Sequence, residues 1–277
     1  MAAALQFQVA THFLQAWGIS ASVSAFATLE DKPPDAWPIT ITSQFNNPDE
    51  EGTHLDDGGQ PTAFVRYDED WAVSASHEML EILADSSCNR LISGPSANSP
   101  PRPVQYLIEV CDPVQTATYP IGDIQVCDFI LPNFYGSATA GSRYDHNGTL
   151  GGPLQVMSGG YLSYQDDGYW WQVRNQNGQI TFLQGPVVGS APPPTSSREY
   201  VHKSFRTHKL RMPLFTEQQR NRHAVFRKAS QDVRREKADA LRQWFPVLKR
   251  IKDHGAHPHD AALQFQELHK RIEDLND

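Results

Sequence analysis

The sequence predicts an α+β fold in which a mixed β-sheet with one prominent helix precedes a helical C-terminal region. Segments in which apolar and polar residues alternate, a pattern typical of strands, recur through the first 184 residues. A helical spacing of apolar residues interrupts them at about residues 71–85. Residues 216–251 are rich in Arg, Lys, Glu and Gln and predict a further helix.

The chain begins with a predicted amphipathic helix, because Leu5, Val9, Phe13 and Trp17 recur every four residues. The same segment lacks the basic start and the small-residue cleavage site of a secretory signal. No apolar run in the sequence approaches the ~18–20 residues that span a bilayer. We therefore expect neither a secretory signal nor a membrane-spanning segment.

Several strands are expected to follow this helix. The segments whose pattern predicts them are 19–29, 37–43, 62–68 and 104–112, and 123–136 predicts a short strand that runs into a proline-limited segment. Residues from about 137 to 197 are rich in Gly, Tyr and Trp, and two segments among them predict hairpin strands. The acidic, turn-rich segment 47–61 and the Pro- and Ser-rich segment 88–103 are expected to be loops. The aromatic residues of the hairpin region could line a substrate cleft, although packing within the sheet is the simpler explanation.

The charge of the chain changes sign near residue 190. Residues 1–190 contain 6 Lys or Arg and 21 Asp or Glu, a net charge of −15, whereas residues 191–277 contain 18 and 11, a net charge of +7. A Pro-, Gly- and Ser-rich stretch lies at this point. We therefore predict a first domain at 1–184, a linker at 185–200 and a basic helical region at 201–277.

The basic C-terminal region is expected to contain a helix with Thr216 as its N-cap and a break at Pro246. Acidic residues are interspersed among the basic ones, and no aromatic stacking platform accompanies them. We therefore do not expect a nucleic-acid partner. Instead, we expect these helices to dock on the acidic domain, to bind a protein partner or to self-associate.

The three cysteines, Cys88, Cys111 and Cys127, are an odd number without C-x-x-C spacing. They indicate neither a disulfide framework nor a zinc ribbon, and a reducing, cytoplasmic setting fits them best. Because free cysteines usually behave as small buried apolar residues, we expect Cys111 and Cys127 to lie in the core.

The predicted helix at 71–85 contains the stretch "SHEMLEILAD", which resembles the H-E-x-x-H zinc signature with a glutamate in place of the second histidine. On a helix, His77 and Glu81 lie one turn apart on the same face, and Glu78 lies beside His77. A carboxylate oxygen is an acceptable zinc ligand, so Glu81 can replace a histidine. Glu78 then has the place of the general base, while Asp85 lies one further turn along.

A third ligand is available in the segment "LIEVCDP", which supplies Glu109 and Asp112. Glu109 interrupts an apolar segment, where an unpaired carboxylate would be costly to bury. Two simpler readings stay open at this point. The helix could be an ordinary amphipathic core helix with its charges in solvent, and Glu109 could face water at a strand edge.

These residues resemble a group of zincin-like proteins. Members of that group carry the pattern S-H-E-x-x-E-x-x-x-D-P followed by E-[IV]-x-D, which is matched here by Ser76, His77, Glu78, Glu81, Asp85, Glu109, Val110 and Asp112. The pattern is similar in bacterial and phage metallopeptidase-like proteins and, more distantly, in the plant exordium family. The segments 126–136 and 159–164 also look like the residues that follow the motif in the bacterial members.

The resemblance covers roughly residues 1–180 and rests on about a dozen positions; the sequence departs from the pattern at Ser86, where the family usually has proline. It implies a zincin-like mixed sheet with an active-site helix, and Zn2+ held by His77 and Glu81 with Glu109 or Asp112. Asp85 stays open as a further ligand, and Glu78 is the implied general base. The expected function is a zinc-dependent hydrolase, a metallopeptidase acting on a peptide or protein. The alternative is a non-catalytic zincin-like module.

Other residues are weaker candidates for the site. His54, beside Asp56 and Asp57, could bind metal, but a polar turn before the next strand is the preferred interpretation. In the layout of zincins, the strand at 62–68 would be the edge strand that holds extended substrate. The side chains considered for stabilising an oxyanion are those of Tyr119, Tyr135, Tyr144 and His146.

Overall fold

A computed structural model describes residues 1–44, 51–98, 100–191 and 195–205 of the chain. The predicted helix at 216–251, with Thr216 and Pro246, lies outside the described residues. Two compact units can be distinguished, and within the described residues the second contains only 26–37, a segment of turns and bends. All other described residues belong to the first unit, which contains both helices and sheets. The α+β class is therefore confirmed for this part of the chain.

The N-terminal helix forms as predicted and continues through residue 17. It consists of α1 (Ala2–Phe7), the π-helical segment η1 (Gln8–Phe13) and α2 (Leu14–Trp17), and it ends at Gly18, whose φ of +68° favours glycine. Val9 and Phe13 on its predicted apolar face are fully buried. This helix therefore contributes one wall of the hydrophobic core.

The expected strand at 19–29 does not form. The side chain of Gln6 pairs with the backbone of this segment instead, because Val23 N–H donates to its Oε1 (2.7 Å) and its Nε2 donates to Ala21 O (3.2 Å). A side-chain amide thus satisfies the backbone groups that a neighbouring strand would satisfy in a sheet. The alternation in sequence reflects the packing of Ile19, Ala21 and Val23 against the hydrophobic core rather than strand pairing.

A three-stranded sheet has the order β1-β3-β2 and comprises β1 (Ile39–Thr42), β2 (Gly52–Asp56) and β3 (Pro61–Arg66). The central strand β3 pairs in parallel with β1 and antiparallel with β2. The expectation that segment 62–68 is an edge strand was therefore wrong. The edge strand is β2, which lies in the acidic segment predicted to be a loop, where Gly and Asp obscure a short strand signal.

Helix α3 (Trp71–Ala84) confirms the predicted helix at 71–85 and packs against β2, β3 and β7. Met79, Leu80 and Ile82 lie in the core, as an amphipathic helix requires. Glu78 and Glu81 are buried as well, so the reading in which these charges face solvent was wrong. An amphipathic helix alone does not explain why two carboxylates are buried with the apolar residues.

A second sheet has five strands in the order β10-β9-β8-β5-β4, and all neighbours are antiparallel. Its strands are β4 (Leu91–Pro95), β5 (Pro103–Leu107), β8 (Tyr161–Asp166), β9 (Tyr169–Gln176) and β10 (Gln179–Val187). The predicted hairpin strands are confirmed, with tight turns at Asp167-Gly168 and Asn177-Gly178 where all four residues have positive φ. Strand β4 was missed because Gly, Pro and Ser surround it.

The segment between β5 and β8 positions the site. Strand β5 ends at Leu107, so the predicted strand at 104–112 was too long, and Glu109 and Asp112 follow the strand rather than belonging to it. Asp112 begins the short 3-10 helix η2 (Asp112–Val114). The hairpin β6 (Thr118–Ile121) and β7 (Ile124–Cys127), and the 3-10 helix η3 (Pro132–Tyr135), complete this region.

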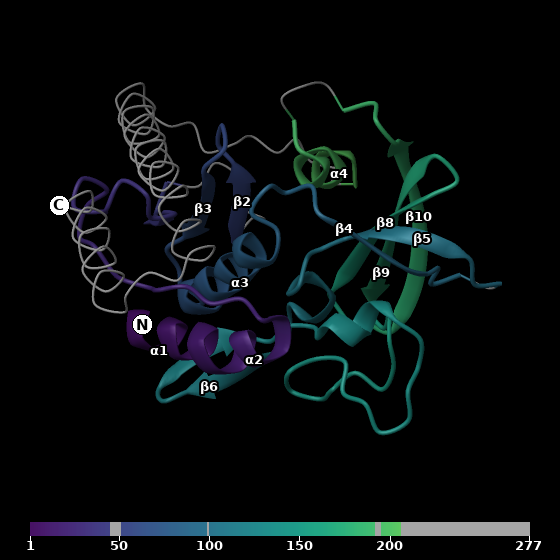
Figure 1. Cartoon of the computed structure of the whole chain (residues 1–277), viewed down its shortest axis with the longest axis horizontal. Coiled ribbons are helices and arrows are strands. Elements are labelled where there is room, and N and C mark those ends of the chain that lie inside the picture. The colour runs from purple at the N-terminus through teal and green to yellow at the C-terminus, as the bar shows by residue number, and fades with distance from the viewer. Residues whose placement is uncertain (45–50, 99, 192–194, 206–277) are drawn as a thin grey trace, which may run out of the picture. The chain divides into compact units, whose positions relative to one another are not determined.

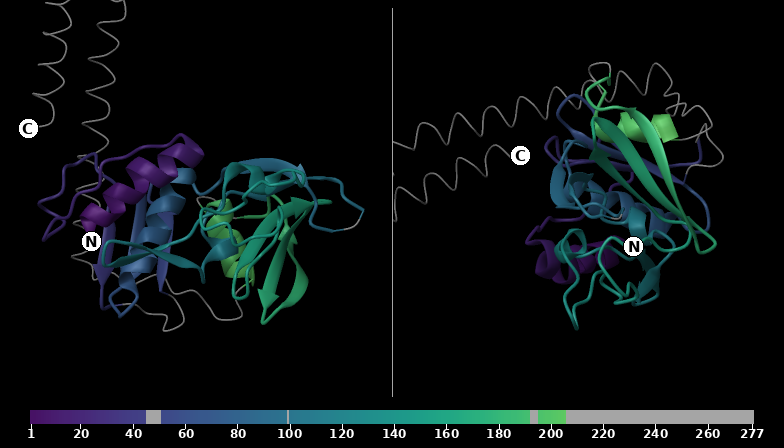
Figure 2. Two further views of the ribbon diagram at one scale, coloured as in Figure 1. Left: turned by 90° about the horizontal axis from the view of Figure 1, so that it is seen from below. Right: turned by 90° about the vertical axis from the view of Figure 1, so that its right-hand side faces the viewer.

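Helix α4 (Ser197–Phe205) begins within the stretch predicted to be a linker and belongs to the same compact unit as the two sheets. Val201 and Phe205 pack against Leu107 and Trp170 of the five-stranded sheet. In Figures 1 and 2, α4 lies between the three-stranded sheet and the five-stranded sheet. This location brings polar residues of α4 toward α3.

Two buried aspartates, Asp128 and Asp145, lie close together at the edge of the core. Asp145 accepts hydrogen bonds from Thr149 and Leu150, which offset the effect of burial and hold its pKa below its ordinary value. Burial, followed by the hydrogen bond with Asp145, raises the pKa of Asp128 to about 8. Asp128 is therefore the protonated member of the pair at neutral pH.

The raised pKa of Asp128 predicts a stability that declines as the pH rises from about 4 to 8, because the unfolded chain releases this proton first. Asp128→Asn keeps a donor toward Asp145 and removes the titration. We expect the variant to gain stability over the wild type by up to ~1.4 kcal/mol per pH unit across this range. Urea unfolding at pH 5, 6.5 and 8 measures the difference, with the exposed Asp123→Asn as control; parallel curves would refute the assignment.

Candidate metal centre

Four carboxylates converge in the interior of the first unit. Glu78 and Glu81 come from α3, whereas Glu109 and Asp112 come from the segment after β5. Their exposed fractions are 4% or less, and Glu81 is completely buried. The reading in which Glu109 faces water is therefore wrong. Four buried carboxylates this close together require positive charge nearby, because an uncompensated buried charge is very costly.

His77, Glu81 and Asp112 are arranged as metal ligands would be. Nε2 of His77 lies 3.1 Å from Oε1 of Glu81 and 3.3 Å from Oδ1 of Asp112, and one ligand atom of each residue fits within a 4.8 Å span. Bonds of zinc to nitrogen and oxygen place tetrahedral ligand atoms about 3.3–3.5 Å apart. The two distances from His77 are therefore compatible with three ligands of one zinc ion.

The three candidates for the third ligand have different surroundings. Asp112 turns toward His77, whereas Glu109 turns toward α4. Asp85 accepts hydrogen bonds from Ser87 and from the backbone of Arg90 (2.7 Å), and it closes the loop after α3. Among the residues that the structure describes, Asp112 is thus the carboxylate that completes the trio with His77 and Glu81.

Glu78 lies next to this trio and is held by His54 of the edge strand. Nδ1 of His54 is 2.7 Å from Oε2 of Glu78 and 3.3 Å from Oε2 of Glu81. Burial lowers the pKa of His54 well below its usual value, so the imidazole is a neutral donor. Gly52 also shapes this place, because a Cβ there would lie 2.7 Å from Oε1 of Glu78. The preferred interpretation of His54 as part of a polar turn was wrong.

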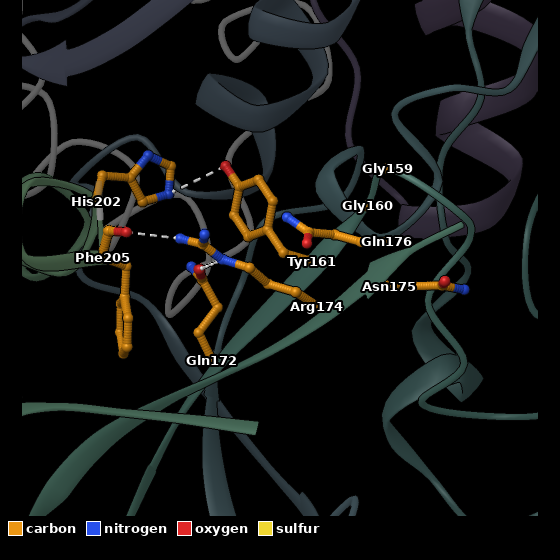
Figure 3. Close-up of a pocket in the computed structure, with 9 residues that line it drawn as sticks. All are labelled: Gly159, Gly160, Tyr161, Gln172, Arg174, Asn175, Gln176, His202 and Phe205. Carbon is orange, nitrogen blue, oxygen red and sulfur yellow. Dashed lines mark hydrogen bonds between the residues drawn. The ribbon is translucent and has the colours of Figure 1, made fainter. Parts of the chain in front are cut away.

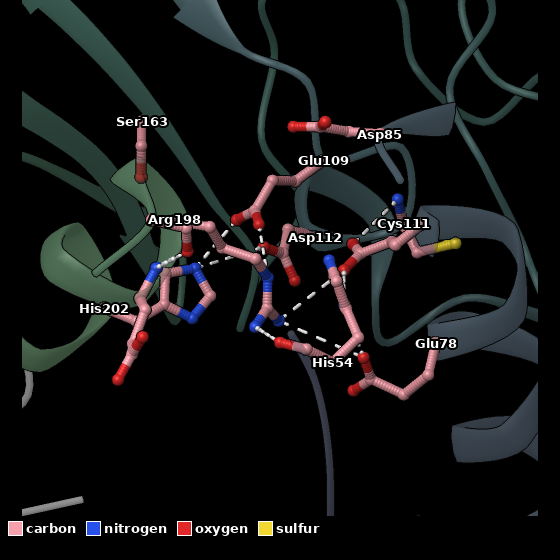
Figure 4. Close-up of polar contacts among 12 residues, drawn as sticks. His54, Glu78, Asp85, Glu109, Cys111, Asp112, Ser163, Arg198 and His202 are labelled. Atoms are coloured by element: carbon pink, nitrogen blue, oxygen red, sulfur yellow. Dashed lines mark hydrogen bonds and ion pairs between the residues drawn. The ribbon is translucent and has the colours of Figure 1, made fainter. Parts of the chain in front are cut away.

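Helix α4 contributes two further residues to the site, Arg198 and His202. Nε of Arg198 lies 2.7 Å from Oε1 of Glu109, and its Nη1 donates to the carbonyl of His54 (2.8 Å). Nε2 of His202 lies 2.8 Å from Oε2 of Glu109. Figure 4 shows both side chains reaching from α4 toward Glu109. They lie about ninety residues along the chain from Glu109 and match no motif, so nothing in the sequence pointed to them.

The charges of the site do not balance within the described residues. Arg198 is its one permanent cation, and its guanidinium faces Glu109 directly and Glu81 at 3.7 Å. One oxygen of each of three carboxylates accepts no hydrogen bond of normal geometry from described residues, namely Oε2 of Glu81, Oε1 of Glu109 and Oδ2 of Asp112. These orphaned oxygens and the excess of carboxylates make the site a place that a divalent cation would stabilise.

The pKa values of the buried groups are shifted in the directions that a deficit of positive charge produces. Burial raises the pKa of Glu78, of Asp112 and, to about 7, of Glu109. Burial acts to lower the pKa of His77, but the charge of Glu81 and the hydrogen bond with Asp112 outweigh it and hold that pKa well above its usual value. Without a metal ion, the site is therefore expected to hold protons in its place.

A pocket of about 260 Å³ lies beside the candidate metal centre. Its lining includes Tyr161 and His202, whose Oη and Nε2 atoms are 3.3 Å apart, and the polar side chains of Gln172 and Arg174 (Figure 3). Since His202 also contacts Glu109, it forms the wall between the pocket and the carboxylates. The aromatic residue Tyr161 thus lines a pocket, whereas Tyr164 and Trp170 pack in the core.

The side chains considered for an oxyanion role are placed differently. The hydroxyl of Tyr119 contacts Gln8 and His12, that of Tyr144 binds the backbone of Thr139, and His146 stacks on Phe129. Tyr135 is buried, and burial followed by the negative charge of Glu109 raises its pKa well above its usual value. Of the four, Tyr135 is the one whose surroundings include the carboxylates of the site.

Comparisons with known proteins found no matching family model, no similar curated protein and no similar solved structure. Within the described residues, none of the helices has the length and apolar character needed to cross a bilayer.

The contacts of Arg198 predict a large role in stability. Arg198→Met leaves Glu109 buried without its closest cation, and we expect the free energy of unfolding to fall by about 3–5 kcal/mol. Urea unfolding in the presence of a chelator measures this change without a competing metal ion. The control is Lys203→Met on the same helix, which removes a pair with Glu199 whose side chains are 41% and 30% exposed and should have a small effect. Equal losses in the two variants would show that Arg198 does not neutralise the site.

Proposed function

We propose that this protein is a zinc-dependent hydrolase and that its substrates are peptides or proteins. The observation that carries the proposal is the trio of His77, Glu81 and Asp112, whose ligand atoms are spaced for a tetrahedral ion. Glu78 lies beside the trio on the same helix, where a general base is needed. The resemblance of the motif to zincin-like proteins supports the same assignment, with a zincin-like fold as the finer description of the α+β class.

In the proposed hydrolysis, each residue of the site has a separate role. Zinc, when bound, supplies a Lewis acid that lowers the pKa of a coordinated water and polarises a carbonyl. Glu78 accepts the proton of the attacking water and returns it to the leaving amine. His54 orients Glu78 through its Nδ1–H, and Gly52 leaves room for the carboxylate. The proposed roles therefore require three ligands and one base.

A peptide substrate suits the edge strand β2 in particular. Its partner on one side is β3, and the carbonyl of His54 is turned away from β3 toward α4, where Arg198 binds it. An extended peptide could pair with this edge through main-chain hydrogen bonds if it displaced Arg198 from the carbonyl of His54. It would then run past Glu78, because His54 on the same strand contacts that residue.

A second candidate function is a non-catalytic module with a structural metal ion. The burial of the site favours it, because all four carboxylates are at most 4% exposed and α4 contributes Arg198 to the same place. A structural zinc site has four protein ligands, whereas a catalytic site keeps one position for water. X-ray absorption spectroscopy of the zinc-loaded protein distinguishes the two.

The cysteines bear on the compartment in which the protein functions. All three cysteines are free and buried, and we propose a reducing compartment such as the cytoplasm. The proposed protein partner or self-association through the C-terminal helices concerns residues that lie outside the described part of the chain.

Metal analysis tests the ligand set. We expect the wild type to bind one zinc ion, and His77→Ala, Glu81→Ala and Asp112→Asn to lose it because each removes a ligand atom. Glu109→Gln is the matched control, since it changes a buried carboxylate of the same cluster that turns away from His77. If the Glu109 variant lost zinc and the Asp112 variant retained it, Glu109 rather than Asp112 would be the third ligand.

Cleavage of a peptide library tests the general base. Glu78→Gln should keep zinc and lower the hydrolysis rate by about 10²-fold or more, because the amide cannot accept the proton. Glu51→Gln, at an exposed residue beside the edge strand, should retain the wild-type rate. A Glu78 variant with bound zinc and full activity would exclude the proposed role.

A further inference from the structure

We infer that Cys127 is a positioning residue for His77, and that Gln8 and Ser76 hold Cys127 in place. The inference rests on the proposed function, because it concerns the orientation of a proposed zinc ligand. It assigns a role to the serine that leads the motif and to a buried thiol that the proposed mechanism does not otherwise use.

The two nitrogens of His77 face different partners. Nε2 faces the carboxylates of Glu81 and Asp112, whereas Nδ1 lies 3.7 Å from Sγ of Cys127, within the range of a hydrogen bond to sulfur. An imidazole that binds a metal through one nitrogen carries its proton on the other. That proton normally goes to a carboxylate or carbonyl, and this contact sets the tautomer and the ring orientation. Here the sulfur of Cys127 takes that place.

A closed ring of hydrogen bonds fixes Cys127. Its backbone N–H donates to Oγ of Ser76 (3.0 Å), and the Ser76 hydroxyl donates to Oε1 of Gln8 (2.8 Å). Nε2 of Gln8 then donates to the carbonyl of Cys127 (2.9 Å). Both backbone groups of Cys127 are therefore held by two side chains that also bind each other.

The ring joins three separate elements at a place without access to water. Gln8 begins the π-helical segment η1, Ser76 lies on α3 directly before His77, and Cys127 ends β7. All three residues are completely buried. A buried polar network is favourable only when its members are satisfied, so replacing any one of them should shift the sulfur relative to the imidazole. Ser76 would thus act on His77 through Cys127.

The zinc affinity of variants at Cys127 tests this role. We expect Cys127→Ala to weaken zinc binding by about 10- to 100-fold in competition with a chelator, as the loss of such a partner typically does. Cys127→Ser should recover part of the affinity, because a hydroxyl can also accept the Nδ1–H. Cys88→Ala, which removes another buried free thiol, should leave the affinity unchanged.

A double-mutant cycle separates positioning from general destabilisation. Ser76→Ala should weaken zinc binding by itself, but the variant with both changes should bind no more weakly than Cys127→Ala, because both act through one contact. Additive losses, or an unchanged affinity in folded Cys127→Ala, would overturn the inference. So would a thiolate-to-metal charge-transfer band in the cobalt-substituted wild type, since Cys127 would then be a ligand.

The metal-free protein gives an independent readout. The Nδ1 proton of His77 should appear as a protected downfield NMR resonance in the wild type and disappear in Cys127→Ala. If the wild type bound no zinc, the proposed function would fail while this resonance still decided the contact between Cys127 and His77. If zinc bound but the resonance and the affinity were the same in both proteins, the positioning role would fail alone.

Discussion

The burial of four carboxylates around α3 is the constraint on which the rest of this unit depends. Glu78, Glu81, Glu109 and Asp112 are almost inaccessible to water, and Arg198 is the one permanent cation among the described residues that reach them. An arrangement of this kind costs several kcal/mol unless further positive charge is bound. Buried charges that destabilise the fold are typical of functional sites. The cluster therefore indicates a cation site rather than a contribution to the stability of the fold.

Much of the architecture around the cluster serves to hold it in place. The N-terminal helix changes to π-helical geometry at Gln8, the residue that reaches the backbone of Cys127. Local π-helical turns inside α-helices are frequent at functional sites. Strand β2 supplies His54 and the space beside Gly52, and α4 supplies Arg198 and His202. Elements far apart in the sequence therefore share one small polar interior.

The sequence predicted the parts of the site that local periodicity encodes. His77, Glu78 and Glu81 follow from helical spacing, and Asp112 could be named because it follows closely in the chain. His54 was misjudged because its strand is short and surrounded by Gly and Asp, so that its alternation is weak. Arg198 and His202 could not be found at all. Their positions depend on how α4 docks on the five-stranded sheet, through contacts such as that of Val201 with Trp170, and one sequence does not encode that pairing locally.

The guanidinium of Arg198 has a thermodynamic consequence for ion uptake. It lies 3.7 Å from one oxygen of Glu81, while the other oxygen faces His77. Two cations that share a carboxylate oppose each other's binding, and the opposing free energy is the same whichever arrives first. A divalent ion bound to the trio would therefore weaken the ion pair between Arg198 and Glu81 by as much as that pair weakens the binding of the ion. Ion binding and the ion pairs of Arg198 would in that sense be thermodynamically linked.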